Sequence, residues 1–353
     1  MAFWLLISTI LFGIMRKIAL GLQFSDPQGT ESIQRTMEGF VNDTDVAVND
    51  GNSATHSTPN QLIQKLQTDA QHWERLLFIS GGKLELNKCF FYLLIWKFSD
   101  DGTPSLMTKA QLPYKLMITQ GNDNEPIEID HKDCATAHRT LGVMKAPNLS
   151  QAGEATRLAQ KYKDHAKAIL SNSVSPTDSA IAYRVYHLTS IGYSLSTTYL
   201  QAKALYKIQG PAVGAFLATN GFNRKMKRCC FHALSSSRNR HGPAPTSPRT
   251  KMYTLLRRHT LHRTELGKQI RIDLACIQQE AGITNPFLEC TQDKIDYVHD
   301  GWISGIRRFL QLAYAEIKFP GIPKPQTYHH GDSYIMEVFR DQGATLAKLK
   351  TLN

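Results

Sequence analysis

The stretch Gly39-Phe40-Val41-Asn42-Asp43-Thr44-Asp45 is the part of the chain around which the rest is organised. It is an apolar run that becomes acidic, and polar residues lie on both sides of it. This pattern predicts two strands that meet at a tight turn and expose carboxylates at its tip. Because carboxylate oxygens are ligands that Mg²⁺ prefers, the turn is a candidate metal site.

The composition is that of a folded protein. The chain has 353 residues, of which 42% are hydrophobic and 9% aromatic, and this is typical of one large or two ordinary domains. Its six cysteines are scattered without the spacing of a disulfide framework or of a zinc site. We interpret them as reduced intracellular thiols, and the group Cys229-Cys230 with His232 as accidental.

Positive charge is concentrated in one segment. Residues 224–271 contain 13 Lys or Arg and a single acidic residue, Glu265. Their excess of +12 accounts for the whole net charge of +11. A basic face of this kind suits the phosphate backbone of nucleic acid.

The first residues of the chain allow two interpretations. The apolar run Met1–Met15 has the length of a signal-peptide core, but no basic segment precedes it and no small-residue cleavage site follows it. It is also too short to span a bilayer before Arg16-Lys17. Large apolar residues recur at helical spacing in residues 4–20, which favours a buried helix. A membrane anchor or signal in residues 1–20 is the alternative.

A second helix and its boundaries are predicted further along. Residues 61–78 carry an apolar stripe at helical spacing, and Ser57 or Thr58 can cap the helix. The pair Gly81-Gly82 ends it.

Strands are predicted next, so that the first 145 residues mix helices and strands as in an α+β fold. The aromatic and aliphatic run at 90–98 predicts a buried strand, and Asp100-Asp101-Gly102 predicts a hairpin turn after it. Further short strands are predicted at 116–118, 127–129 and 140–143.

The pattern becomes helical from about Leu149. Apolar stripes predict helices at 154–170, 177–193 and 198–219, and we place a domain boundary at Pro147-Asn148. Residues 229–250 have no hydrophobic periodicity and are rich in Ser, Arg, Pro and His. Helical patterns return from Met252 onward, at 302–317 and at the C-terminus.

Three motifs resemble those of reverse transcriptases and occur in the same order. Phe40-Val41-Asn42-Asp43 resembles the (Tyr/Phe)-x-Asp-Asp turn, motif C. Residues 80–89, from Ser80-Gly81-Gly82 to Asn87-Lys88-Cys89, resemble motif D, in which a glycine turn leads to Asn-Lys ahead of a strand. Thr140-Leu141-Gly142-Val143 resembles the Leu-Gly of motif E, which grips the primer strand.

Two later segments, 182–194 and 207–224, are similar to the thumb of retroelement reverse transcriptases. The resemblance covers roughly residues 1–228 and resumes at about 252. It is to the palm and thumb of retrotransposon enzymes, and non-LTR (LINE-like) elements fit better than the Ty1/copia or gypsy types.

The resemblance implies an α+β fold, with a partial polymerase palm (mixed α/β, with a short antiparallel sheet) and a mainly helical thumb region. The expected parts are a palm fragment at 1–147, a thumb-like region at 148–228, a basic irregular linker at 229–251 and a C-terminal helical region at 252–353. The N-terminal helix would be the palm helix between motifs B and C. The linker is either a phosphate-binding surface or a run translated in a shifted reading frame.

The chain departs from the family at the residues that carry the chemistry. Nucleotidyl transfer needs two divalent ions held by carboxylates, and the family supplies one aspartate from motif A and a pair from motif C. No motif A setting precedes Phe40, and Asn42 replaces the first motif C aspartate. Asp43 is therefore the remaining catalytic and metal-ligating residue. Asp45 is expected to point along the outgoing strand, and Lys88 marks the motif D position near the pyrophosphate.

The resemblance also implies partners. Mg²⁺ is the implied cofactor, and the missing ligands predict that it is not bound productively. RNA or DNA is expected to bind without sequence preference through the phosphate backbone. The residues expected to contact it are Leu141, Gly142, Arg224, Lys225, Lys227 and Arg228.

Our interpretation is a degenerate fragment of an RNA-directed DNA polymerase, a nucleotidyltransferase by ancestry, that is catalytically inactive. It is expected inside the cell, in the cytoplasm or the nucleus, without a stable membrane partner. The alternative is a membrane-anchored or secreted non-enzymatic protein that uses residues 1–20 as anchor or signal. A third interpretation is a repurposed nucleic-acid-binding module in which the palm remnant serves as a scaffold.

Overall fold

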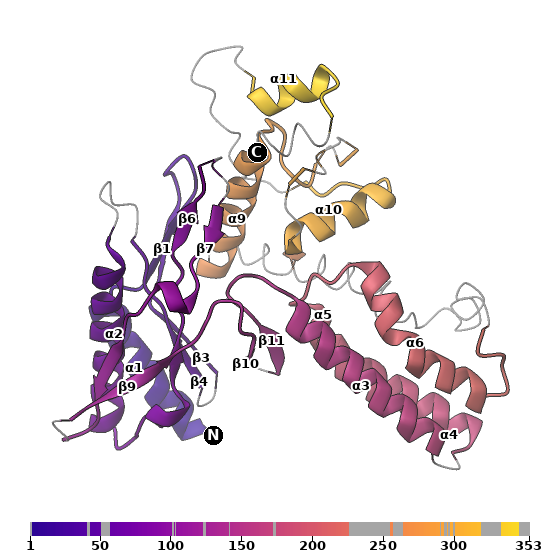
Figure 1. Cartoon of the computed structure of the whole chain (residues 1–353), viewed down its shortest axis with the longest axis horizontal. Coiled ribbons are helices and arrows are strands. Elements are labelled where there is room, and N and C mark those ends of the chain that lie inside the picture. Colours follow the sequence, from indigo (N-terminus) through magenta and orange to yellow (C-terminus); the bar gives the residue numbers. More distant parts are fainter. Residues whose placement is uncertain are drawn as a thin grey trace. The chain divides into compact units, whose positions relative to one another are not determined.

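The chain forms an α+β fold (Figure 1). The computed structural model describes residues 2–40, 43–50, 57–100, 102, 104–122, 125–140, 142–171, 174–225, 255–256, 264–289, 291–292, 295, 297–298, 301–318 and 333–345. It divides into two compact units, one of residues 1–25, 29–141 and 145–150, the other of residues 26–28, 142–144 and 151–353. Each unit is described by itself.

The first unit begins with helix α1 (Ala2–Ile18), as the apolar spacing predicts. Only one side of this helix is buried. Leu11, Met15 and Ala19 pack against the second helix of the unit. The other side exposes a row of large apolar side chains, formed by Leu6, Ile10, Ile14 and Ile18. The helix therefore contributes to the core and also presents an apolar surface.

The acidic stretch forms the predicted hairpin, with β3 (Met37–Phe40) antiparallel to β4 (Asp43–Val46). Cross-strand partners share a face of the ladder. Gly39 pairs with Thr44, while Glu38 pairs with Asp45. Gly39 lies against the Phe12 ring of α1, so the opposite face, with Glu38, Asp43 and Asp45, points away from this helix.

Helix α2 (Pro59–Ile79) confirms the predicted amphipathic helix and its start. Thr58 caps it, and the Gln61 side chain accepts from the Thr58 N–H at 2.8 Å, which completes a capping box. The chain leaves the helix through Gly81, whose φ of +81° is readily adopted by glycine. Trp73 stacks on Phe12 of α1, with ring centroids 5.5 Å apart.

A buried carboxylate joins the two helices. Asp69 of α2 has no exposed surface. It accepts hydrogen bonds from the backbone N–H groups of Leu20 and Gly21, at 3.0–3.2 Å, just after α1 ends. These charge-assisted bonds offset the desolvation of the carboxylate and fix the exit of the chain from α1.

A three-stranded sheet completes the core of the first unit. Strand β9 (Pro126–His131) lies between β8 (Leu116–Thr119), which is antiparallel to it, and β5 (Phe90–Phe91), which is parallel. Two of these strands confirm the predictions at 116–118 and 127–129. Apolar side chains of the sheet pack on α2 through Ile63.

The prediction of one buried strand over residues 90–98 is wrong. The run breaks after β5, and its second half is the exposed strand β6 (Trp96–Phe98). Among the described residues, strand β6 pairs with β7 (Pro104–Leu106) alone, across the predicted turn, where Gly102 donates to the Ser99 carbonyl. Apolar composition indicated a strand here but could not show which half the core would cover.

The prediction of a strand over residues 140–143 is also wrong. Strand β10 (His138–Thr140) pairs with β11 (Val143–Lys145), and Gly142, with a φ of +82°, lies in the turn between them. The remaining elements of this region are short: β1 (Leu22–Ser25), β2 (Ser32–Arg35), and the 3₁₀ helices η1 (Leu86–Lys88) and η2 (Lys109–Gln111).

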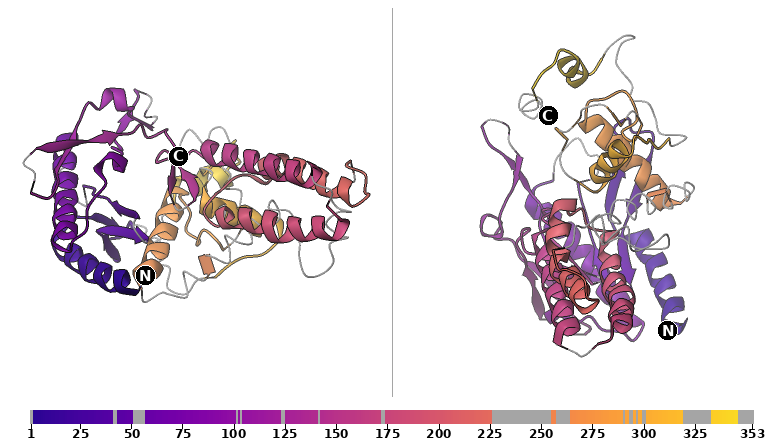
Figure 2. Two further views of the ribbon diagram at one scale, coloured as in Figure 1. Left: turned by 90° about the horizontal axis from the view of Figure 1, so that it is seen from below. Right: turned by 90° about the vertical axis from the view of Figure 1, so that its right-hand side faces the viewer.

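The second unit contains a helical bundle. Helix α3 (Ala152–Ser171) packs along α6 (Ala202–Thr219), and the two run side by side in Figures 1 and 2. In the sequence, α3 and α6 are separated by one continuous helical path. It is composed of α4 (Pro176–Ile181), the π-helix η3 (Ala182–Leu188) and α5 (Thr189–Leu195). The three predicted helices are confirmed, but the π-helix was not predicted.

The C-terminal part of this unit contains α9 (Glu265–Glu280), α10 (Trp302–Leu312) and α11 (Ile335–Asp341) around their own apolar cluster. The Trp302 indole donates to the Ser196 carbonyl at 2.8 Å, beyond the end of α5. The predicted basic linker at 229–251 lies outside the described residues. No helix that the structure describes combines the length and apolar composition needed to cross a bilayer.

The Asp69 contact gives a stability prediction for the first unit. Asp69→Ala should lower the free energy of unfolding by about 3 kcal/mol, because it leaves the N–H groups of Leu20 and Gly21 without their acceptor. Urea denaturation measures the change, and faster amide exchange at Leu20 and Gly21 should localise it. The exposed acid Glu85 provides the matched control, since Glu85→Ala should change stability by less than about 0.5 kcal/mol. Equal effects of the two substitutions would refute a special role for Asp69.

Candidate functional site: the acidic hairpin

The candidate site is the open face of the β3–β4 hairpin. Asp43 is exposed as the first residue of β4, directly after the turn. The turn residues Val41 and Asn42 lie outside the described residues. Asp45 lies two residues further along the same strand, so alternation places it on the same face as Asp43. Asp45, which we expected to point along the outgoing strand, thus shares this face with Asp43.

A third carboxylate shares this face. Glu38 lies directly opposite Asp45 in the ladder, and its carboxylate also pairs with Arg35 at 2.7 Å. Partial burial raises the pKa of Asp45 above its ordinary value, and repulsion from Glu38 and Asp43 raises it further. Acidic groups are thus concentrated here at an electrostatic cost.

A cation of the same unit offsets part of that cost. Lys145 and His138, at the outer ends of the β10–β11 hairpin, lower the pKa of Asp45 by Coulombic attraction. His138 itself has a lowered pKa, caused first by burial and then by Lys132. The Lys132 ammonium lies 3.3 Å from His138 Nδ1 and 3.7 Å from the Phe90 ring centroid. Because this lowered pKa leaves His138 neutral near pH 7, Lys145 is the positive side chain that acts on Asp45 there.

The described residues do not provide a complete metal site. Nowhere among them do three or more His, Cys, Asp or Glu side chains form a group that could hold an ion. The carboxylates of the hairpin come from neighbouring strand positions, and a tight Mg²⁺ site requires oxygens that converge in octahedral geometry. The arrangement therefore supplies negative potential without a described ligand shell.

The other predicted site residues lie in different places. Lys88 is exposed at the end of η1, just before β5. Gly142 lies in the β10–β11 turn and belongs to the second unit. Arg224 and Lys225 are exposed after α6, and the Lys225 N–H donates to the Asn223 side chain at 2.8 Å. The predicted contact residues Leu141, Lys227 and Arg228 lie outside the described residues.

Sequence reasoning missed the residues that face the acidic hairpin. His138 and Lys145 are separated from Asp45 by more than ninety positions in the chain. No local spacing links them to the hairpin, because their approach depends on tertiary packing. Glu38 could have been found, since a hairpin register that pairs it with Asp45 follows from the turn position.

A buried histidine pair was also missed. His187 of the π-helix is 1% exposed, and its Nδ1 lies 2.8 Å from Nδ1 of His165 on α3. Burial lowers the pKa of His187 to about 3, with smaller contributions from His165 and Lys161. Tyr162 packs edge-on against its ring. The pair is therefore neutral near pH 7 and belongs to the packing of the bundle.

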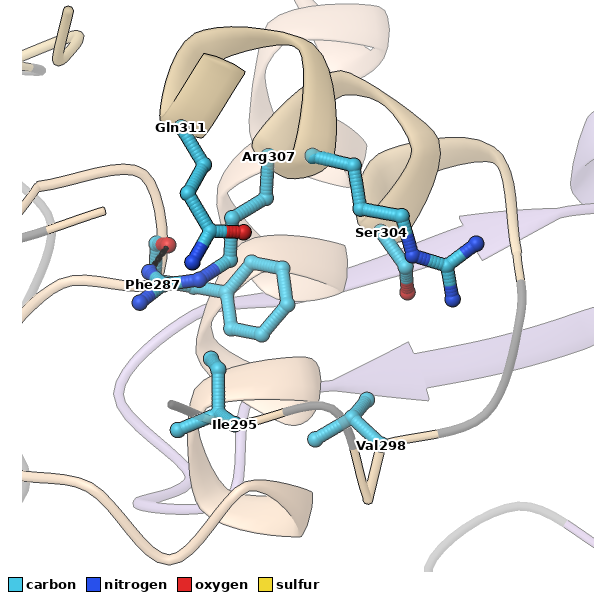
Figure 3. Close-up of a pocket in the computed structure, with 7 residues that line it drawn as sticks. Phe287, Ile295, Val298, Ser304, Arg307 and Gln311 are labelled. Carbon is cyan, nitrogen blue, oxygen red and sulfur yellow. Dashed lines mark hydrogen bonds between the residues drawn. The ribbon is translucent and has the colours of Figure 1, made fainter. Parts of the chain in front are cut away.

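One small pocket lies in the C-terminal part of the second unit (Figure 3). Its apolar lining comes from Phe287, Ile295 and Val298. Arg307, only 4% exposed, donates to the carbonyls of Phe287 and Glu289. The guanidinium thus ties two backbone segments together, which gives it a structural role.

Comparison with known proteins provides no independent assignment. No protein-family model, no curated protein and no solved structure matches the chain. A function must therefore be inferred from its residues and their arrangement.

The raised pKa of Asp45 predicts a pH-dependent effect of its neutral isostere. The fold favours the protonated form, so ionisation of Asp45 costs stability as the pH rises above 3.8 and through the higher folded-state pKa. Asp45→Asn should therefore raise the melting temperature at pH 7 and lose this advantage at pH 3. Thermal unfolding at both pH values measures it, with the exposed Asp164→Asn on α3 as control. A variant less stable than the parent at pH 7 would contradict this electrostatic account.

Proposed function

We propose that the chain is a degenerate reverse-transcriptase fragment that has lost polymerase chemistry and retains sequence-independent binding of RNA or DNA. One observation carries the proposal. The β3–β4 hairpin keeps its carboxylates on an open face, and the Lys145 ammonium acts on Asp45 by Coulombic attraction.

The order and packing of the elements support a palm origin. A polymerase palm must hold its acidic turn rigidly while leaving one face open to the substrate. Here α1 packs on α2 and β3, while Asp43 and Asp45 are on the opposite face of the hairpin from Gly39. The hairpin at 138–145 and the helical bundle follow in the order in which motif E and the thumb follow a palm.

The charges of the hairpin support the loss of chemistry. Two-metal catalysis requires carboxylates that together hold two divalent ions. Asn42 replaces one of them with a neutral amide. Lys145 supplies positive charge that acts on Asp45, as a metal ion would. Mg²⁺ would therefore gain little by binding, although the family uses it.

The second unit supports nucleic-acid binding. Residues 179–225 contain no Asp or Glu and five Lys or Arg. Arg224 and Lys225 are exposed where this stretch ends. Release of counterions from phosphates drives binding to such a surface without regard to base sequence. Phosphate contact by these two residues is thus the retained part of the function.

Salt dependence tests this proposal. Affinity for a labelled RNA–DNA hybrid should fall by about 100-fold between 50 and 200 mM KCl, as expected for about four phosphate contacts. The double variant Arg224→Gln/Lys225→Gln should reduce the slope of log Kd against log salt by about two. Fluorescence anisotropy measures both, with the exposed Lys83→Gln of the first unit as control. Absence of binding at 50 mM, or an affinity independent of salt, would refute the proposal.

A further inference from the structure

The helical path between α3 and α6 exposes an aromatic face. Tyr186 is 71% exposed and Tyr193 is 59% exposed. Ile181 and Val185, also more than half exposed, extend the same path toward its start. Exposed apolar patches of this kind mark binding surfaces. We call Tyr186 and Tyr193 the tyrosine face.

The interior of the bundle keeps these rings on the outside. The same path buries Tyr183, His187 and Leu195, each less than 5% exposed. Tyr183 stacks on His187 and contacts Phe216 of α6. If the helical path rotated so that the tyrosine face became buried, these core residues would become exposed. The packing of the core therefore keeps the two tyrosines at the surface.

A glycine turn lies near one of the rings. A Cβ atom on Gly142 would lie 3.8 Å from the edge of the Tyr193 ring, and the φ of Gly142 is +82°. The backbone turn therefore passes near one side of the ring. Since 59% of Tyr193 remains exposed, the turn leaves much of the ring open to a stacking partner.

The charge of the sequence that contains this face favours a polyanion over an apolar protein partner. The stretch from 179 to 225 lacks acidic residues entirely. Its cations include Lys203 and Lys207, which are exposed on α6. Protein partners that bind apolar patches do not need such a one-sided charge, whereas nucleic acid requires it.

We propose that the tyrosine face stacks the unpaired bases of single-stranded RNA or DNA. This inference rests on the proposed nucleic-acid binding and adds the preferred form of the ligand. A duplex keeps its bases stacked inside, so it offers phosphates but few base faces. Tyr186 and Tyr193 are about 10 Å apart along the helix axis, a length that about three stacked bases fill.

An oligonucleotide without bases separates stacking from phosphate binding. We compare a labelled thymidine 12-mer with an abasic 12-mer of equal charge, by anisotropy at constant low salt. The full chain should bind the thymidine strand at least tenfold more tightly. Tyr186→Ala and Tyr193→Ala should each weaken thymidine binding by roughly tenfold and leave abasic binding unchanged.

Two control variants test the chemistry of the ring. Tyr193→Phe keeps an aromatic face and should bind thymidine strands like the parent. Phe98→Ala removes an exposed ring from β6 of the other unit and should have no effect. Circular dichroism establishes that each variant retains its helices.

The outcomes distinguish this inference from the proposed function. Equal, salt-dependent affinity for both strands would overturn stacking and leave phosphate binding intact. No binding of either strand at 50 mM salt would overturn both. Self-association of the parent that Tyr186→Ala abolishes would show that the tyrosine face contacts a second copy of the chain, and would also overturn the inference.

Discussion

The first unit depends on the buried carboxylate of Asp69. A charged group without exposed surface is destabilising unless its acceptors are satisfied, and here the N–H groups of Leu20 and Gly21 satisfy them. The bonds fix the end of α1 beside α2. Phe12 of α1 can then stack on Trp73 and contact Gly39 of the hairpin. One face of the hairpin is thereby committed to the core, and the acidic face is left open.

An open acidic face has two ways to offset its charge: a bound cation or a cation of the protein. The chain supplies the second through Lys145, whose positive charge acts on Asp45. The pKa of Asp45 is nevertheless raised, because burial and its acidic neighbours outweigh the opposing attraction. Groups with perturbed pKa values are enriched at functional sites, although structural charge networks also produce them.

The sequence predicted the features that depend on local patterns. The spacing of apolar residues predicted α2, α3 and α6, and the sequence also indicated the Thr58 cap. The acidic hairpin was predicted from the run of apolar and then acidic residues at 39–45. Features that depend on long-range packing were missed. The break after Phe91 depends on where β9 pairs, and the placement of His138 and Lys145 depends on tertiary contacts. The π-helix leaves no simple periodic signal, because its seven residues continue a helical run.

The proposed function requires that the hairpin no longer supports polymerase chemistry. Primer extension on an RNA template, with Mg²⁺ or Mn²⁺ and the full chain, tests this most directly. We expect no template-dependent synthesis with either ion, and no difference between the parent and Asp43→Ala. Template-dependent synthesis that Asp43→Ala abolishes would contradict it, because Asp43 would then be a working metal ligand.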